Sequence, residues 1–264
     1  MTPILMLGAG RMGWALIEGW LSADTFLPAD LILRDPFPTE LALVIAKAGA
    51  RLNPDDPVLR EAQTVVLAVK PQLWRETAAQ VAHLLSPTAI LVSVAAGVAC
   101  ADISKAFGGL HVARVMPTTA AAIGMGVASL YAATSEARDR AHQLFDPVGT
   151  VVDLDDEDLL HAATGVSGSS PAYFYAFVEA LETAGVAVGL SPDAAKVLAR
   201  STMAGAAALM AASGTEPREL RQQVTSPNGT TAAALEILMS DQGFEPLLRN
   251  AVAAATRRSR ELGG

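Results

Sequence analysis

Residues 3–13 read PILMLGAGRMG, in which a short apolar run leads directly into a glycine-rich turn. Such a run is typical of a strand buried in a parallel sheet. In the turn, Gly8 allows a tight bend, Gly10 lets a pyrophosphate approach the backbone, and Gly13 lets the following helix pack closely on the strand. The stretch therefore predicts a dinucleotide-binding βα unit, with cofactor contacts from Gly8, Ala9, Gly10, Arg11, Met12 and Gly13.

A second apolar strand is predicted at residues 30–33 and ends in Arg34 and Asp35. An acidic residue at this point favours NAD because it can bind the ribose hydroxyls, whereas a basic residue favours the additional phosphate of NADP. The chain has both, and the pair could also be only a solvated strand end. We expect Arg34 and Asp35 to contact the cofactor, with NADP favoured and NAD possible.

Further apolar runs alternate with helical patterns through the first half of the chain, which predicts a doubly wound, mainly parallel sheet of the Rossmann type. The predicted strands cover residues 3–7, 30–33, 64–69, 89–94, 112–116, 127–132 and 150–154. Two strand ends should face the cofactor. We assign contacts there to Ala68, Val69, Lys70 and Pro71 and, near the nicotinamide, to Ala95, Ala96 and Gly97. The alternatives are a surface lysine and a plain tight turn.

The chain changes character after the acidic run at residues 153–158, which we interpret as a solvated linker and helix start. Residues 164–181 read TGVSGSSPAYFYAFVEAL, with Ser170 as expected N-cap and Pro171 at the first helical position. The helix is apolar nearly all round, which is typical of a buried helix. It would pack against the other half of the chain or a second subunit, or form the core of one large domain. We place an N-terminal domain at 1–157 and an all-α domain at 158–264.

The second half continues as helices at about residues 192–212, 217–224 and 245–262. Gly205 lies inside the first of these, which predicts a closely packed neighbouring helix. Between the second and third is the turn Ser226-Pro-Asn-Gly-Thr-Thr231, followed by another helix. Backbone N–H groups and two hydroxyls at a helix start can bind an anion, such as a carboxylate. Simple capping by Thr230 or Thr231 is an equally good interpretation of this turn alone.

Composition excludes several functional classes. The chain has 264 residues, a net charge of −8 and a single cysteine, Cys100. The charge disfavours nucleic acids and anionic membranes as partners. One cysteine and four scattered histidines predict neither a disulfide framework nor a metal site. With no signal-like segment before the first strand, and with glutamates inside the longest apolar helix, we expect a cytoplasmic, metal-free protein that does not enter a membrane.

Taken together, these motifs resemble pyrroline-5-carboxylate reductases. The matching stretches are GAGRMG at Gly8, AVKP at Ala68, SVAAGV at Ser93, MPTTAA at Met116, GVSGSSPAY at Gly165 and SPNGTTAAAL at Ser226. The last two are the most specific. The chain departs from the usual pattern at Thr118, Ala120 and Asn228, where the family commonly has Asn, Pro and Gly. Because Asn tolerates a left-handed backbone, the turn at Asn228 should keep its shape.

The resemblance implies a Rossmann domain, a helical dimerisation domain and a homo-oligomer, either a dimer or a ring of dimers. It implies hydride transfer from NAD(P)H to the C=N carbon of 1-pyrroline-5-carboxylate, which gives L-proline. The substrate would bind between the cofactor and the turn, which either the same chain or a partner chain supplies. The implied substrate-binding residues are Ser226, Asn228, Gly229, Thr230 and Thr231, and the Thr231 hydroxyl would bond the ring nitrogen as the catalytic group.

Two other functions are compatible with the same fold. A hydroxyacid dehydrogenase would need a lysine on the central helix, and none stands between Pro171 and Leu190. A non-catalytic NADP-binding protein would have no need for an anion-binding turn at residues 226–231. Both alternatives are therefore weaker than reduction of a cyclic imine.

Overall fold

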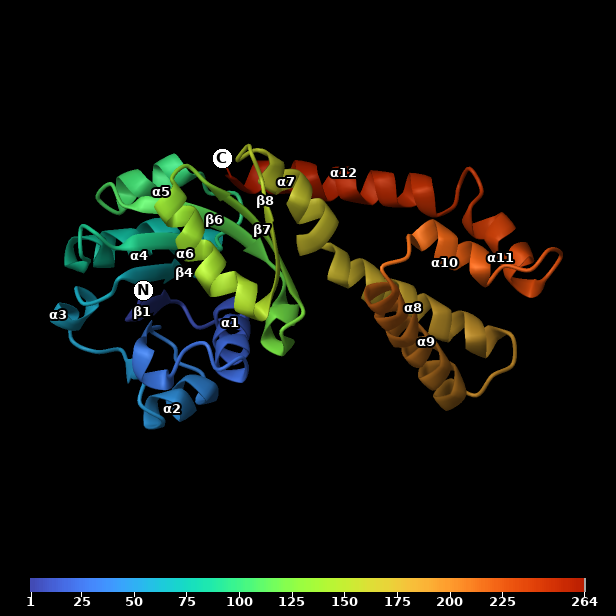
Figure 1. Ribbon diagram of the computed structural model, residues 1–264, viewed down its shortest axis with the longest axis horizontal. Helices are drawn as coiled ribbons and strands as arrows, with labels where there is room; N and C mark the ends of the chain where they lie inside the picture. The colour runs from blue at the N-terminus through green and yellow to red at the C-terminus, as the bar shows by residue number, and fades with distance from the viewer. Residues whose placement is uncertain (264) are drawn as a thin grey trace. The chain divides into compact units, whose positions relative to one another are not determined.

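The computed structural model describes residues 1–263. The chain divides into two compact units. The first comprises Met1–Gly168 together with the chain from Ala254 onward, and the second is Ser169–Ala253. Figure 1 labels the helices and strands of both units.

The first unit is built on an eight-stranded sheet with the order β3-β2-β1-β4-β5-β6-β7-β8. All neighbouring strands run parallel except β6 and β7. The chain winds outward from β1 in both directions, so the switch point of the sheet lies between β1 and β4. The strands are β1 Ile4–Leu7, β2 Leu31–Arg34, β3 Arg51–Leu52, β4 Thr64–Leu67, β5 Ile90–Ser93, β6 His111–Pro117, β7 Gly126–Ala132 and β8 Gly149–Asp153.

Helices cover both faces of this sheet. Alternation along β1 sends Ile4 and Met6 to one face and Leu5 and Leu7 to the other, and all four side chains are fully buried. The first face packs against α1 (Arg11–Ser22), α2 (Glu40–Lys47) and α6 (Ser135–Phe145). The second packs against α3 (Asp56–Leu59), α4 (Trp74–Val81) and α5 (Cys100–Ala106). Figure 1 shows α6 crossing in front of β6 and β7. The predicted doubly wound, mainly parallel sheet is confirmed.

Three short elements were not evident from the sequence. β3 has two residues and α3 has four, which is too short to give a periodic signal. The helix α5 begins directly after the turn that contains Gly97, whose φ of +79° suits glycine. The predicted strand at residues 64–69 ends at Leu67 in the structure, so Ala68 to Lys70 form a loop at the carboxyl edge of the sheet.

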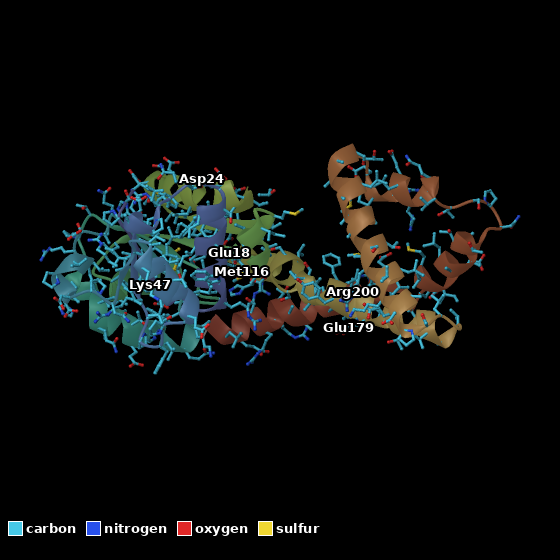
Figure 2. All side chains as sticks on the ribbon, turned by 90° about the horizontal axis from the view of Figure 1, so that it is seen from below. Glu18, Asp24, Lys47, Met116, Glu179 and Arg200 are labelled. Atoms are coloured by element: carbon cyan, nitrogen blue, oxygen red, sulfur yellow. The ribbon has the colours of Figure 1, made fainter. Side chains whose placement is uncertain are left out.

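The second unit is helical. Its helices α8 (Ser170–Ala187) and α9 (Pro192–Ser213) pack as an antiparallel pair, in which a Cβ added at Gly185 would lie 3.1 Å from the Cβ of Ala195. Arg200 on α9, which Figure 2 labels, also pairs with Glu182 on α8, with 2.7 Å between Nε and Oε1. The remaining helices are α10 Pro217–Gln223, α11 Thr230–Leu238 and α12 Phe244–Gly263, the last of which has residues in both units.

The start of the central helix differs from the prediction. The short helix α7 (Leu159–Ala163) continues into a π-helical turn at Thr164–Gly168, and the N-cap of α8 is Ser169, not Ser170. Ser169 itself has helical dihedral angles, and the Thr164 hydroxyl donates a hydrogen bond to the Leu160 carbonyl at 2.7 Å. The small residues therefore form a continuous helical segment, so no separate capping loop precedes α8.

The alternative in which α8 forms the core of a single domain is wrong. Its side chains are exposed in the isolated chain, by 53% for Phe174, 68% for Tyr175 and 41% for Leu181. Around Gly205 on α9, an added Cβ would meet no other atom of the described chain within 4 Å. An apolar helix that its own unit leaves so exposed presents a surface suited to a further partner.

The acidic run at residues 153–158 is not simply a solvated linker. Glu157 accepts hydrogen bonds at 2.7 Å from the buried guanidinium of Arg114 and at 2.7 Å from the main-chain N–H of Cys100, the first residue of α5. Asp158 pairs with Arg260 at 2.7 Å. These carboxylates join β6, α5 and the end of α12 within the first unit, because each has a cationic or N–H partner in the folded chain.

Candidate functional site

A groove of about 860 Å³ lies at the carboxyl ends of β1, β2 and β4. This is the crevice in which open α/β sheets bind nucleotides. Seven of the predicted cofactor residues line it: Gly8, Gly10, Arg34, Asp35, Ala68, Val69 and Lys70. A smaller cavity that involves Thr118 holds no space for a ligand, so the groove is the better nucleotide site.

The three glycines of the turn meet different surroundings. Gly8 has a φ of +89°, a left-handed conformation that favours glycine. A Cβ at Gly13 would lie 2.5 Å from the Gly8 carbonyl oxygen, so only glycine allows this approach of helix to strand. A Cβ at Gly10 would meet no atom of the described chain within 4 Å, and Gly10 lines the groove. The turn thus provides an open backbone cradle at the start of α1, which fits a pyrophosphate.

The two charged residues that end β2 have different partners. The Asp35 carboxylate accepts hydrogen bonds from the main-chain N–H groups of Ala9 at 2.7 Å and Phe37 at 2.8 Å. The Arg34 guanidinium donates to the Pro54 carbonyl at 3.1 Å and pairs with Asp56 at 3.4 Å. Asp35 therefore fastens the glycine-rich turn to β2, while Arg34 lies along the rim of the groove.

The other predicted cofactor residues do not line the groove: Ala9, Arg11, Met12, Pro71, Ala95, Ala96 and Gly97, as well as the close-packed Gly13. Ala95 is buried, and its N–H donates to the Ser93 hydroxyl at 3.2 Å. Other groove residues were missed from the sequence: Phe37, Asn53, Leu73, Glu76, Thr77 and Gln80. Leu73, Thr77 and Gln80 belong to the segment that follows the strand end at Lys70 and Pro71, so their place near the cofactor could have been predicted from the sequence. Nothing in the sequence indicated a cofactor contact for Phe37, which is 86% exposed in the structure.

The turn at residues 226–231 contains a left-handed residue and a closely packed glycine. Asn228 has a φ of +57°, so asparagine does keep the left-handed conformation expected there. A Cβ at Gly229 would lie 2.3 Å from the Ser226 hydroxyl oxygen. Gly229 is the N-cap of α11, and within the described residues no side-chain hydrogen bond caps this helix. The structure therefore does not support capping by Thr230 or Thr231, the alternative interpretation of the turn.

The main-chain N–H groups at the start of α11 differ in whether they have a carbonyl partner. The N–H of Gly229 donates to the Ser226 carbonyl at 3.1 Å, and the N–H of Ala233 donates to the Gly229 carbonyl at 3.2 Å. The three N–H groups between them, of Thr230, Thr231 and Ala232, have no carbonyl partner within the helix. These are the groups that can meet a carboxylate, together with the half-buried Thr231 side chain.

The single cysteine is not activated as a nucleophile. Burial raises the pKa of the Cys100 thiol to about 12, so the thiol stays protonated and is a poor nucleophile. Within residues 1–263, no three His, Cys, Asp or Glu side chains are grouped so that they could hold a metal ion. None of the helices in this same range is long and apolar enough to cross a membrane.

Comparison with known proteins covers nearly the whole chain. Residues 157–262 match the family described as pyrroline-5-carboxylate reductase dimerisation. Residues 3–97 match the family described as NADP oxidoreductase coenzyme F420-dependent. The pyrroline-5-carboxylate reductase of Pseudomonas aeruginosa is 39% identical, over 99% of this chain and 97% of that protein.

Solved structures show the same likeness. A pyrroline-5-carboxylate reductase from Coxiella burnetii has a TM-score of 0.90 at 29% identity, over 100% of this chain and 99% of that one. The Plasmodium falciparum pyrroline carboxylate reductase, solved with NADP bound, has a TM-score of 0.86 at 25% identity, over 100% of this chain and 98% of that one. The similarity spans both compact units, and the chain therefore belongs to the pyrroline-5-carboxylate reductase family.

Proposed function

We propose that this protein reduces 1-pyrroline-5-carboxylate to L-proline, the last step of proline biosynthesis, with NADPH as the hydride donor. The observation that carries this proposal is whole-length similarity to pyrroline-5-carboxylate reductases, at 39% identity over 99% of the chain. NADP as the cofactor follows from the matched NADP oxidoreductase family and the NADP-bound relative. The open backbone at Gly10 supports a dinucleotide at this site, since a pyrophosphate, which NAD and NADP share, can approach there.

In this proposal the turn before α11 binds the substrate. The N–H groups of Thr230, Thr231 and Ala232 hold the carboxylate at the positive end of the helix. Ser226 and Asn228 shape the turn, and Gly229 lets the backbone of residue 229 approach the Ser226 hydroxyl. The Thr231 hydroxyl bonds the ring nitrogen and thereby selects the face of the ring that is reduced.

The first unit holds the cofactor. The residues of the glycine-rich turn bind the pyrophosphate, Arg34 and Asp35 lie at the adenosine end, and Ala68 to Pro71 with Ala95 to Gly97 flank the nicotinamide side. Bound NADPH supplies a hydride, which adds to the imine carbon. The chain contributes position and orientation, because none of the proposed substrate contacts is a strong general acid. The ring nitrogen takes its proton through Thr231 or water, or arrives protonated.

Assembly completes the proposal. A homodimer formed through the helical region would cover the apolar residues of α8, which are exposed in a single chain. We further propose that the protein works in the cytoplasm as a homo-oligomer, either a dimer or a ring of dimers. A dimer also fits the small-molecule chemistry, since a closed interface can exclude water from a hydride transfer.

A steady-state assay tests the activity. The purified full chain is mixed with NADPH and either 1-pyrroline-5-carboxylate or a 2-keto acid, and NADPH oxidation is followed. Oxidation that depends on pyrroline-5-carboxylate is the expected result, with rescue of a proline auxotroph as the cellular counterpart. Oxidation with only the 2-keto acid would support the hydroxyacid dehydrogenase alternative. Binding of NADPH without oxidation in either mixture would support a non-catalytic protein.

A further inference from the structure

Asp35 and Arg34, at the end of β2, have different roles, which the sequence alone did not distinguish. Both oxygen atoms of the Asp35 carboxylate already accept main-chain N–H groups, from Ala9 and Phe37. Asp35 is thus engaged in holding the glycine-rich turn. Arg34, whose side chain is 38% exposed, lies beside it on the groove and can reach a ligand.

NADP differs from NAD at a single position, the 2′-oxygen of the adenosine ribose. In NADP this oxygen carries a phosphate with a charge of about −1.5 to −2, for which arginine is a favoured partner. Arg34 and Lys70 are the cationic side chains among the described residues that line the groove. Lys70 follows β4, on the other side of β1 from β2, so Arg34 is the cation at the end of the strand where the adenosine ribose binds.

Arg34 already has an anionic partner. Asp56, at the start of α3, lies 3.4 Å from its Nη2 atom, and the two side chains are 38% and 56% exposed. The contact is long and open to water, so it is weak enough to be exchanged. A 2′-phosphate that approaches Arg34 must displace this carboxylate or tolerate its negative charge, whereas a ribose hydroxyl meets no such competition.

We propose that Asp56 limits the preference of this enzyme for NADPH over NADH by competing with the 2′-phosphate for Arg34. Asp56 is a positioning residue, since it acts on the cofactor through the guanidinium. The inference rests on the proposed function only in taking the groove as the cofactor site. Replacing the carboxylate with an amide of the same shape frees Arg34 for the phosphate and strengthens discrimination.

Isothermal titration with two adenosine nucleotides tests this directly. Adenosine 2′,5′-bisphosphate and 5′-AMP differ only in the 2′-phosphate, and neither requires turnover. In Asp56→Asn, the ratio of the two dissociation constants should move toward the bisphosphate by about two- to fivefold, the range of an exposed ion pair. Asp55→Asn is the matched control, because it removes the same charge from the adjacent exposed residue, which makes no side-chain cap to α3. Its ratio should equal that of the unmodified enzyme.

A second pair of variants tests the route through Arg34. In an Arg34→Gln background, Asp56→Asn should change the ratio by clearly less than in the unmodified enzyme. An equal change in both backgrounds, or a ratio in Asp56→Asn no different from Asp55→Asn, would overturn the inference. Both outcomes leave the proposed function intact, because reduction of pyrroline-5-carboxylate is measured separately. Thermal unfolding of each variant confirms that the compared proteins are folded.

Discussion

The carboxylate of Asp35 accepts a hydrogen bond from the main-chain N–H of Ala9 at 2.7 Å, across 26 positions of sequence. Asp35 is itself held by Asn53, whose side chain accepts from the Asp35 N–H at 2.9 Å and donates to its carbonyl at 2.8 Å. The end of β2 therefore fixes the shape of the turn that follows β1. A residue expected to contact the cofactor thus also shapes the backbone that receives the phosphates.

Replacing Asp35 with alanine should weaken NADP⁺ and NADPH binding by about tenfold, because a charge-assisted hydrogen bond to the turn is lost. Asp35→Asn keeps one acceptor oxygen, so its affinity for NADPH should lie between that of Asp35→Ala and that of the unmodified protein. Fluorescence titration of NADPH measures the affinity. The control is Asp30→Ala, which also removes a carboxylate that accepts a main-chain N–H, from Leu27 at 2.9 Å, but does not line the groove. Equal affinities for Asp35→Ala and Asp30→Ala would contradict the proposed role.

Alanine at Gly13 and alanine at Gly10 should have different effects, the first on stability and the second on NADPH binding. Gly13→Ala places a Cβ 2.5 Å from the Gly8 carbonyl oxygen and should lower the free energy of unfolding by about 2 kcal/mol or more. Gly10→Ala has room for its Cβ and a φ of −69°, so it should cost less than about 1 kcal/mol. The added methyl group nevertheless points into space that the pyrophosphate needs. Denaturant unfolding and NADPH titration together check this, and unchanged NADPH affinity in Gly10→Ala would refute it.

Thr231→Ala should lower kcat by about 10- to 100-fold, the size of a lost hydrogen bond to a reacting group. The dissociation constant for NADPH should stay unchanged, because the turn belongs to the second unit and not to the groove. Thr231→Ser retains the hydroxyl and should recover most of the rate. Thr230→Ala keeps its main-chain N–H and provides a neighbouring control. Full activity in Thr231→Ala would remove this residue from catalysis.

Sequence predicted the sheet well because its strands carry strong local signals. Fully buried runs such as residues 64–67, and a glycine-rich turn with three separate steric roles, can be read without tertiary information. The left-handed conformation at Asn228 was expected from the resemblance, since the family commonly has glycine there and asparagine tolerates positive φ. Local chemistry decided the strands and the glycine-rich turn, so local reasoning was enough for them.

Other features depend on contacts between distant residues, which local patterns do not report. Nothing near Glu157 in the sequence indicates that it meets Arg114 and the start of α5. The partner of Arg34 is likewise found 22 positions away, on a four-residue helix. Periodicity reported the apolar surface of α8 correctly, but it cannot distinguish burial within a chain from burial between chains.

His142 should make stability depend on pH. Burial alone would lower the pKa of this imidazole, but hydrogen bonds from its ring to Asp153 and Asp146 raise it overall above 6.5. A raised folded-state pKa gives stability that is fully present below the unfolded pKa and lost as pH rises through the folded value. The free energy of unfolding lost in His142→Gln should therefore be larger at about pH 5.5 than at about pH 9, by less than about 1 kcal/mol for this partly exposed group. A loss that grows with pH would contradict the assignment.

Isotope transfer tests the central claim most directly. The purified full chain is incubated with 1-pyrroline-5-carboxylate and NADPH that carries deuterium at both C4 positions of the nicotinamide, and the proline formed is analysed by mass spectrometry and NMR. The account predicts L-proline with a single deuterium, bonded to the former imine carbon. Formation of no proline, or of proline without deuterium at that carbon, would contradict it.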